Sequence, residues 1–471
     1  MFEKINESFS KIKLSESQKL ELTAFDPTMK YKLPMRVKYN PDLQNVKLYN
    51  TLGDSEIISN GFLELLGLTK KQKRIVSIYK KYLKIISKLK SLEPFKYQKQ
   101  AICDALFYKH LLIEAATGAG KSYIIALLTQ ILYLQKLKGV IVVPNITLVN
   151  QIKSDFESYG IFLNPTLIGG NNKGDLSSQL TITTWQSLKN FRDKTFDFDF
   201  IIVDEAHSAK ADVLRTIINK CTRAKYKIAL TGTIPKLRID YLKLVGLFGL
   251  PMKLLTQRDL IEKGLGTEIE IKKIELNYSD FPEGEYQSQV KFIKENKNRT
   301  RFISKLANGL KGNTIVLFSH TKHGLELFYG ILSLRNVNKN NAYKDLIFQK
   351  EIKVFFINGL INGEQREIIR NLLEKYDDCI LVANYSCIGT GTNIKNLKNI
   401  IFAHPRKSYV SVTQALGRLI RKHENKTVSR VFDIVDNFGV FKRHFSERRI
   451  NCYESQNYSI ETILKQDLWK N

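Results

Sequence analysis

Cysteine is scarce in this chain. The five cysteines are odd in number, scattered, and never spaced as Cys-x-x-Cys; they are Cys103, Cys221, Cys379, Cys387 and Cys452. A disulfide framework needs paired cysteines and a structural zinc site needs clustered ones, so the pattern argues against both. We expect a protein of a reducing compartment that holds no structural zinc.

Long hydrophobic runs are also missing. No apolar stretch approaches the ~18 residues that span a bilayer. The first residues, MFEKINESFSKIKLSESQ, contain no apolar segment of the kind found in secretory signals. We therefore expect a soluble, cytoplasmic protein without a membrane partner.

Acidic residues are under-represented. Aspartate and glutamate number 46 against 74 lysines and arginines, which gives a formal net charge of +28. Such an excess favours a polyanionic partner, of which nucleic acid is the commonest. The alternative is a generally lysine-rich composition, because lysine and asparagine are abundant throughout the chain.

The length of 471 residues predicts two or three domains. Residues 1–90 mix short alternating and helix-like stretches, and predict a small α+β accessory module that binds DNA and ends in a basic connector helix. Further on, short apolar strands alternate with amphipathic helices, which is typical of a parallel sheet covered on both faces. We expect two such α/β domains, over residues 91–275 and 276–471.

The connector helix is the most basic part of the chain. Between Lys70 and Lys90 there are many lysines and arginines and no acidic residue, and apolar residues recur at helical spacing. Most such runs are the solvated face of a packed helix. The alternative is an element that contacts nucleic-acid phosphates.

A glycine-rich turn follows a predicted strand. Residues 115–122 read AATGAGKS, which fits P-loop spacing between the strand HLLIEA and an apolar helix. Small residues let backbone N–H groups approach phosphates, and the helix N-terminus adds the positive end of its dipole. Lys121 would neutralise the β- and γ-phosphates, and Ser122 would hold Mg²⁺. A glycine-rich turn of another α/β fold is the alternative, but both flanks match here.

An acidic box ends another predicted strand. Residues 200–207 read FIIVDEAH, and the carboxyl ends of strands are where ligands bind in a doubly wound sheet. Asp204 would bind Mg²⁺, Glu205 would orient and deprotonate the attacking water, and His207 completes the box. Alone, a strand ending in Asp-Glu often only caps a helix.

A third motif lies in the second α/β domain, where residues 414–421 read QALGRLIR. Arg418 and Arg421 are three apart, which predicts that they share one helix face. Arginines that reach a nucleotide stabilise charge on the transferring phosphoryl group. A basic surface helix is the alternative, because Lys422 and His423 follow.

Together these motifs resemble those of superfamily 2 helicases and translocases. Further motifs of that family follow in order over about residues 94–436. The resemblance implies two RecA-like motor domains in tandem, with ATP and Mg²⁺ as cofactors. The implied catalytic residues are Lys121, Asp204, Glu205, His207, Gln414, Arg418 and Arg421. The implied nucleotide contacts are Gln98, which would recognise adenine, Thr117, Gly118, Ala119, Gly120, Lys121, Ser122 and Gly391.

The same resemblance implies contacts to the nucleic-acid backbone. The residues concerned are Pro144, Asn145, Gln151, Gly169, Gly170, Thr183, Thr184, Ser319, His320, Asn358, Gly359 and Thr390. Thr231-Gly232-Thr233 matches the motif that couples hydrolysis to domain closure. Two positions depart from the family: Gly232 stands where alanine is common, and Asn393 stands where aspartate is frequent.

Within the superfamily, the chain is similar to the phage branch-migration helicases. It shares their Thr-Trp-Gln segment, a motif of the form Gly-Arg-x-x-Arg-Lys-His, and a short amino-terminal module. The resemblance implies a monomeric enzyme of the host-cell cytoplasm that remodels branched or forked DNA. Its implied activities are branch migration, fork regression and D-loop or R-loop unwinding, in replication, recombination and repair.

Two other functions fit the same fold. One is an ATP-dependent RNA helicase, which comparison of ATPase stimulation by DNA and RNA would separate. The other is a non-catalytic DNA-binding scaffold, and the complete set of expected ATP-site residues argues against it.

Overall fold

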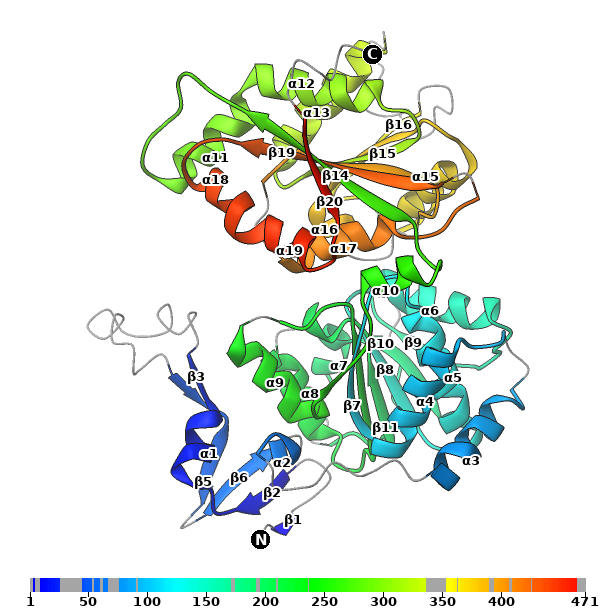
Figure 1. Ribbon diagram of the computed structural model, residues 1–471. Coiled ribbons are helices and arrows are strands. Elements are labelled where there is room, and N and C mark those ends of the chain that lie inside the picture. The colour runs from blue at the N-terminus through cyan, green and yellow to red at the C-terminus, as the bar shows by residue number, and fades with distance from the viewer. Residues whose placement is uncertain are drawn as a thin grey trace. The chain divides into compact units, whose positions relative to one another are not determined.

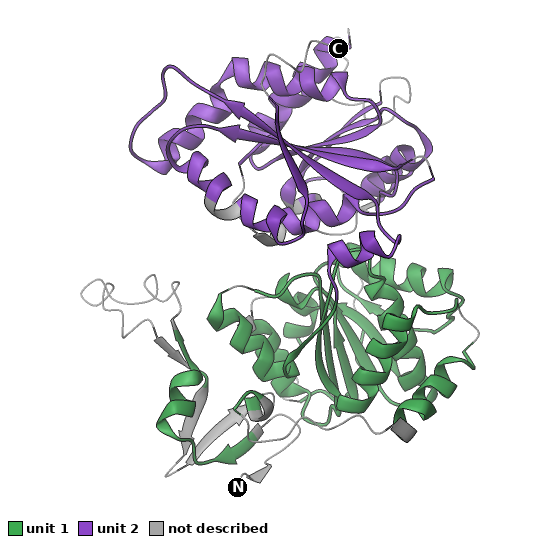
Figure 2. Ribbon diagram, viewed as in Figure 1, with its two compact units in different colours: residues 1–254 green, residues 255–471 purple. Residues whose placement is uncertain are grey.

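Packing divides the chain of the computed structural model into two compact units, Met1–Leu254 and Leu255–Asn471 (Figure 2). Within the described residues, no helix is long and apolar enough to cross a membrane. The structure describes residues 3–4, 9–25, 45–52, 55–59, 62–66, 76–89, 92–170, 174–191, 195–208, 211–235, 237–335, 353–361, 363–388, 394–405, 409–424 and 426–463.

The amino-terminal module combines antiparallel strands with short helices, as its sequence predicts. One sheet has the order β1-β2-β6-β5, and β3 pairs with β4. The elements are β1 (Glu3–Lys4), β2 (Phe9–Ile12), α1 (Glu16–Glu21), β3 (Thr23–Phe25), β4 (Asn45–Lys47), β5 (Tyr49–Leu52), β6 (Ser55–Ser59), α2 (Phe62–Leu65) and α3 (Val76–Ile86). The predicted basic helix is thus present as α3, while residues 70–75 lie outside the described residues.

The module shares a hydrophobic core with the first α/β sheet's helix α9 (Arg238–Phe248). Leu22 and Phe62 of the module are buried with Leu242 and Val245 of this helix. A Cβ atom placed on Gly246 would lie 2.6 Å from the Phe62 ring. Because the glycine makes room for that ring, the module packs directly on α9 within the first unit.

The first unit's large sheet has the order β13-β7-β12-β11-β8-β10-β9, and the six strands from β7 to β9 run parallel. The seven strands of the sheet are β7 (His110–Ala115), β8 (Gly139–Val143), β9 (Thr166–Ile168), β10 (Leu180–Thr184), β11 (Phe200–Val203), β12 (Tyr226–Thr231) and β13 (Pro251–Leu255). Most of their residues are buried on both faces, as expected for near-continuous apolar strands.

Helices cover both faces of this sheet (Figure 1). One face carries α4 (Lys96–Tyr108), α5 (Lys121–Leu134) and α6 (Ile146–Ser158). The other carries α7 (Trp185–Lys189), α8 (Ala211–Lys220) and α9, whose apolar residues join the core under strands β8 and β11. The predicted doubly covered α/β domain is confirmed.

The second unit contains a parallel sheet of order β16-β17-β15-β18-β19-β14-β20. Its strands are β14 (Glu268–Leu276), β15 (Asn313–Phe318), β16 (Val354–Ile357), β17 (Ile380–Asn384), β18 (Leu397–Phe402), β19 (Val428–Asp436) and β20 (Ser459–Ile463). Its helices are α10 (Gln257–Glu262), α11 (Tyr286–Glu295), α12 (Lys297–Gly309), α13 (Thr321–Leu334), α15 (Gly363–Lys375), α16 (Tyr385–Ile388), α17 (Tyr409–Leu419), α18 (Gly439–His444) and α19 (Ile450–Glu454), with a π-helix over Phe445–Arg449.

The division between the units differs from the expected one between residues 275 and 276. Strand β14 pairs along its whole length with β19 of the second sheet, which places residues 268–275 in the second unit. The stretch around it lacks the alternating strand–helix rhythm because α10 and β14 follow each other with no long helix between them. A strand and its partner 160 residues later are not linked by any local pattern.

Candidate functional site

The glycine-rich turn of residues 115–122, which we call the phosphate loop, joins β7 to α5 at the carboxyl edge of the first sheet. Gly118 and Gly120 have φ angles of +93° and +73°, a left-handed conformation that glycine adopts readily. Gly120 is also the N-cap of α5, so Lys121 and Ser122 lie in the first helical turn. The Nζ atom of Lys121 is 3.3 Å from the Ala115 carbonyl, which holds the ammonium group over the loop.

Helix α4 supports this loop from outside. Gln98 and Tyr97 both donate hydrogen bonds to the Ala119 carbonyl, at 3.3 and 3.1 Å. The other end of the Gln98 amide accepts a hydrogen bond from the Phe95 N–H. Gln98 is thus a brace of the phosphate loop, and its implied contact with adenine stays a prediction. The role of the Tyr97 hydroxyl was not foreseen from the sequence, although Tyr97 stands in the same short segment.

The acidic box follows β11 at the same edge. Glu205 Oε1 lies 3.3 Å from Lys121 Nζ, and Glu205 Oε2 lies 3.3 Å from both His207 Nδ1 and the Gly232 N–H. Glu205 has φ +47°, a strained conformation for a residue with a side chain. These contacts place one carboxylate between the phosphate loop, the acidic box and the coupling motif.

His207 links the acidic box to the coupling motif. The Thr231 hydroxyl donates to the Thr233 carbonyl at 2.8 Å and lies 2.6 Å from His207 Nδ1. Because that hydroxyl has one hydrogen and already donates it, His207 Nδ1 must be the donor to Thr231. The side chains therefore form a continuous path from Glu205 through His207 to Thr231.

The two neighbouring carboxyl groups have shifted pKa values of opposite sign. Burial, reinforced by the charge of Glu205, raises the pKa of Asp204 to about 7. Burial also opposes ionisation of Glu205, but the charges of Lys121 and His207 and the Gly232 N–H outweigh it, so the pKa of Glu205 is lowered. Burial lowers the pKa of His207, although Glu205 opposes this.

These residues fit a nucleoside triphosphate with a divalent cation. The loop offers glycine backbone without Cβ atoms, a helix N-terminus and an ammonium group, which together suit phosphate oxygens. A Cβ atom on Gly232 would lie 3.4 Å from Lys121 Nζ, so glycine leaves space beside the lysine. Asp204 and Ser122 supply oxygen ligands of the kind Mg²⁺ prefers, and a cation would relieve the repulsion between the adjacent carboxylates.

The first unit gathers its predicted nucleic-acid contacts along the same carboxyl edge, at the ends of β8, β9 and β10. Several of these side chains already have a structural task. Asn145 caps α6 through the Leu148 N–H, Thr184 caps α7 through the Ser187 N–H, and Thr183 is fully buried. Gly170, by contrast, is exposed with φ +60°. Pro144, Gln151 and Gly169 lie at the same strand ends or in α6.

The second unit places four predicted contacts at the carboxyl ends of its own strands. Ser319 and His320 follow β15, and Asn358 and Gly359 follow β16. Burial lowers the pKa of His320, helped by the charge of Lys294. Thr390 and Gly391 lie outside the described residues, so their predicted roles are not addressed by the structure.

The prediction that Arg418 and Arg421 share one helix face is wrong. Helix α17 ends at Leu419, and Arg421 instead forms an antiparallel bridge with Gly266. The Lys426 ammonium group donates to the Leu419 carbonyl at 2.7 Å and satisfies the helix end. Gln414 and Arg418 do lie in α17, where Arg418 is 8% exposed. Spacing alone could not show where the helix stops.

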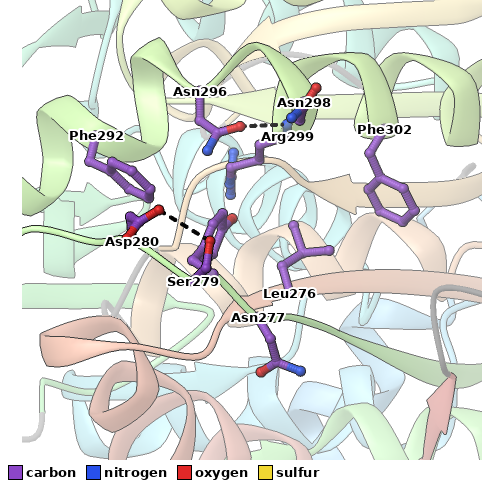
Figure 3. A pocket seen from close by; sticks show the side chains of 10 residues that line it. Leu276, Asn277, Ser279, Asp280, Phe292, Asn296, Asn298, Arg299 and Phe302 are labelled. Carbon is purple, nitrogen blue, oxygen red and sulfur yellow. Dashed lines mark hydrogen bonds between the residues drawn. The ribbon is translucent and has the colours of Figure 1, made fainter.

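A cavity of about 360 Å³ lies at the carboxyl end of β14 (Figure 3). Its wall includes Arg299, which pairs with Asp436 through two hydrogen bonds of 2.7 and 2.9 Å. Tyr278 donates to the same carboxylate at 2.6 Å. These three polar groups of the cavity wall thus satisfy one another.

Comparisons with known proteins agree with this geometry. Residues 91–236 match the family described as type III restriction enzyme, res subunit, and residues 298–423 match the helicase conserved C-terminal domain. The ATP-dependent DNA helicase uvsW of Enterobacteria phage T4 is 32% identical over 375 residues, which is 76% of this chain and 71% of the relative.

Two solved structures share the fold. A putative HsdR subunit of a type I restriction enzyme from Vibrio vulnificus has a TM-score of 0.57 at 18% identity and covers 79% of this chain and 68% of its own. The DUF1998 helicase MrfA bound to DNA has a TM-score of 0.59 at 15% identity and covers 84% of this chain and 56% of its own. Both likenesses concern the tandem parallel-sheet architecture.

The identity and coverage of the phage relative and the two family matches lead to one conclusion. The chain belongs to the superfamily 2 helicases with tandem RecA-like domains, in the family of the phage T4 helicase uvsW.

Proposed function

We propose that this protein is an ATP-driven DNA translocase that remodels branched DNA by branch migration, fork regression and unwinding of D-loops and R-loops. The observation that carries the proposal is the contact path from Lys121 through Glu205 and His207 to Thr231. This path joins Lys121, which would hold the γ-phosphate, to Thr231 of the motif that would couple hydrolysis to domain closure. The similarity to a phage DNA helicase supports DNA as the substrate.

At the nucleotide, each residue has a distinct task. Lys121 and the loop amides hold the phosphates, while Ser122 and Asp204 hold Mg²⁺, which neutralises charge on the phosphate oxygens. Glu205, kept ionised by its neighbours, orients the attacking water and accepts its proton. Arg418 and Arg421 stabilise the negative charge on the transferring phosphoryl group.

At the nucleic acid, exposed backbone groups at the carboxyl edges of both sheets contact phosphates. Contacts of this kind carry no sequence information, which suits a motor that moves along any DNA. Their affinity should fall steeply with salt, because phosphate contacts release counterions. The amino-terminal module, packed on α9, is the element that selects branched substrates.

The test is ATP-dependent strand separation on a matched panel of fork, four-way junction, linear duplex, RNA–DNA hybrid and duplex RNA, with Lys121→Ala as the inactive control. We expect the junction and fork to be processed fastest and Lys121→Ala to be inactive on all substrates while still binding DNA. Preference for duplex RNA would replace the DNA motor by an RNA helicase. Hydrolysis by Lys121→Ala at the wild-type rate would refute the assignment of the phosphate loop.

A further inference from the structure

The segment between the two sheets is bound closely to the part of the chain that carries the arginines. The last strand of the first sheet, β13, ends at Leu255, and Gln257 begins helix α10 after a single intervening residue. The side chain of Thr256 accepts from the Asp259 N–H while the Asp259 carboxylate accepts from the Thr256 N–H, so the start of α10 is defined. Gln257 is therefore held at a fixed point of the connection.

Gln257 is a buried amide with both ends bonded. It is 2% exposed, its Nε2 donates to the Thr413 carbonyl at 2.9 Å, and its Oε1 accepts from the Tyr458 hydroxyl at 2.8 Å. Thr413 lies in α17, five residues before Arg418. Both hydrogen bonds can form only when the amide, Thr413 and Tyr458 keep this arrangement, and the loss of either bond leaves a buried polar group unsatisfied.

The end of the same connection grips the chain at Arg421. The Thr267 N–H donates to the Ile420 carbonyl at 2.7 Å, and the Thr267 hydroxyl donates to the Arg421 carbonyl at 3.2 Å. Gly266 forms the bridge with Arg421, and a Cβ atom there would lie 2.5 Å from Ile420 Cγ2. Residues 256–267 thus hold both ends of the segment that runs from Thr413 to Arg421.

We propose that this connection is a positioning element for Arg418 and Arg421, and that Gln257 is its principal positioning residue. The inference rests on the proposed function, because it assumes that these arginines act on the nucleotide. Gln257 itself touches neither nucleotide nor DNA in this scheme. It sets the place of α17, and misplacement of a catalytic group by ~1 Å can cost about 100-fold in rate.

The test compares Gln257→Leu with Gln289→Leu in the full-length protein. Gln289 is a matched control, because it is 4% exposed and also bonded at both ends, to the Gly284 carbonyl and the Val440 N–H, away from α17. Both substitutions remove the two hydrogen bonds of a buried amide in the second unit, so they should lower the melting temperature similarly. We expect DNA-stimulated kcat to fall about 10- to 100-fold for Gln257→Leu, with KM for ATP and DNA affinity within about twofold of wild type, and kcat of Gln289→Leu to stay near wild type.

A mutant cycle in which Arg418 and Arg421 are both replaced by alanine identifies the route. If Gln257 acts through the arginines, Gln257→Leu should have little further effect on kcat once both arginines are already alanine. Tyr458→Phe, which removes only the hydroxyl that donates to Gln257, should lower kcat by a smaller factor and serves if the leucine variant does not fold.

The outcomes separate this inference from the proposed function. Multiplicative losses in the cycle, or equal kcat for the two leucine variants and for wild type, overturn the positioning role while leaving the motor intact. A wild-type chain that hydrolyses no ATP, or normal turnover when both Arg418 and Arg421 are alanine, overturns the role of the arginines and with it the inference.

Discussion

The carboxyl edges of the two parallel sheets carry charged groups in opposite ways. At the first sheet, Lys121 and Glu205 lie 3.3 Å apart with side chains that are 10% and 20% exposed. At the second, Arg299 and Asp436 are completely buried and joined by two hydrogen bonds, with Tyr278 completing the carboxylate. The charged pair of the first sheet is thus partly exposed and is called the open set, whereas the pair of the second sheet is enclosed. A buried pair contributes to the shape of the fold, whereas the open set is available for chemistry.

The largest effect should come from the open set. Glu205→Gln should lower ATP turnover about 10²- to 10⁴-fold, because a general base is lost. The unfolding transition of the first unit, followed by the fluorescence of buried Trp185, should move little, because the exchange keeps the side-chain volume. A large loss of stability with normal turnover would reverse the comparison between the two edges.

The enclosed pair should behave in the opposite way. Asp436→Asn leaves Arg299 buried without a counter-charge, and breaking a buried pair costs about 3–5 kcal/mol. Faster hydrogen–deuterium exchange in β14 and β19 would report it. The control is Asp197→Asn in the exposed pair Arg223–Asp197, where about 0–1 kcal/mol is expected. Similar effects at the two sites would show that enclosure of Asp436 does not matter.

A smaller change should test whether the open edge depends on the amino-terminal module. Helix α9, which holds the module, begins five residues after Thr233 of the coupling motif. Phe62→Ala removes the ring that packs at Gly246 and should destabilise the first unit by about 3 kcal/mol, measured by urea denaturation. We expect turnover per folded molecule to stay near wild type. A large loss of ATP turnover with an unchanged free energy of unfolding would show that the module contributes to hydrolysis.

The smallest effect is a pH dependence of the second unit. His323 is 2% exposed, and burial together with the nearby charges of Arg299, His320 and Lys294 lowers its pKa from 6.5 to about 3. Below about pH 6.5 this histidine is protonated in the unfolded chain but stays neutral in the folded chain. The free energy of unfolding therefore falls as the pH drops from about 6.5 towards 3, by about 1.4 kcal/mol per pH unit. His323→Leu should remove this slope, which denaturation at pH 6.5 and 4.5 measures. An unchanged slope would place the acid sensitivity on other groups.

Some features of the site could be predicted because they are local in the sequence. The glycines of the phosphate loop stand between a strand and a helix, so their conformation and the place of Lys121 followed from eight consecutive residues. The acidic box was equally visible at the end of an apolar strand. The brace formed by Tyr97 and Gln98 was not, because it depends on a carbonyl more than twenty residues away.

The end of α17 shows why other features were missed. Helical spacing was consistent with a helix through Arg421, and nothing in the local residues forbids it. The helix stops because the chain beyond it pairs with Gly266 and Thr267, about 150 residues earlier. The same reason explains the unit boundary, since β14 belongs to a sheet whose partner strand lies far along the chain.

By itself, the sequence determined that this chain forms parallel-sheet domains with a phosphate loop and an acidic box at strand ends, since strand alternation and glycine placement act over a few neighbouring residues. Only the tertiary structure decided which charges stay open and which are enclosed. It also decided that the amino-terminal module shares a core with α9 and that Gln257 holds α17. These outcomes depend on contacts between residues far apart in the chain, whose meeting is set by packing and not by local pattern.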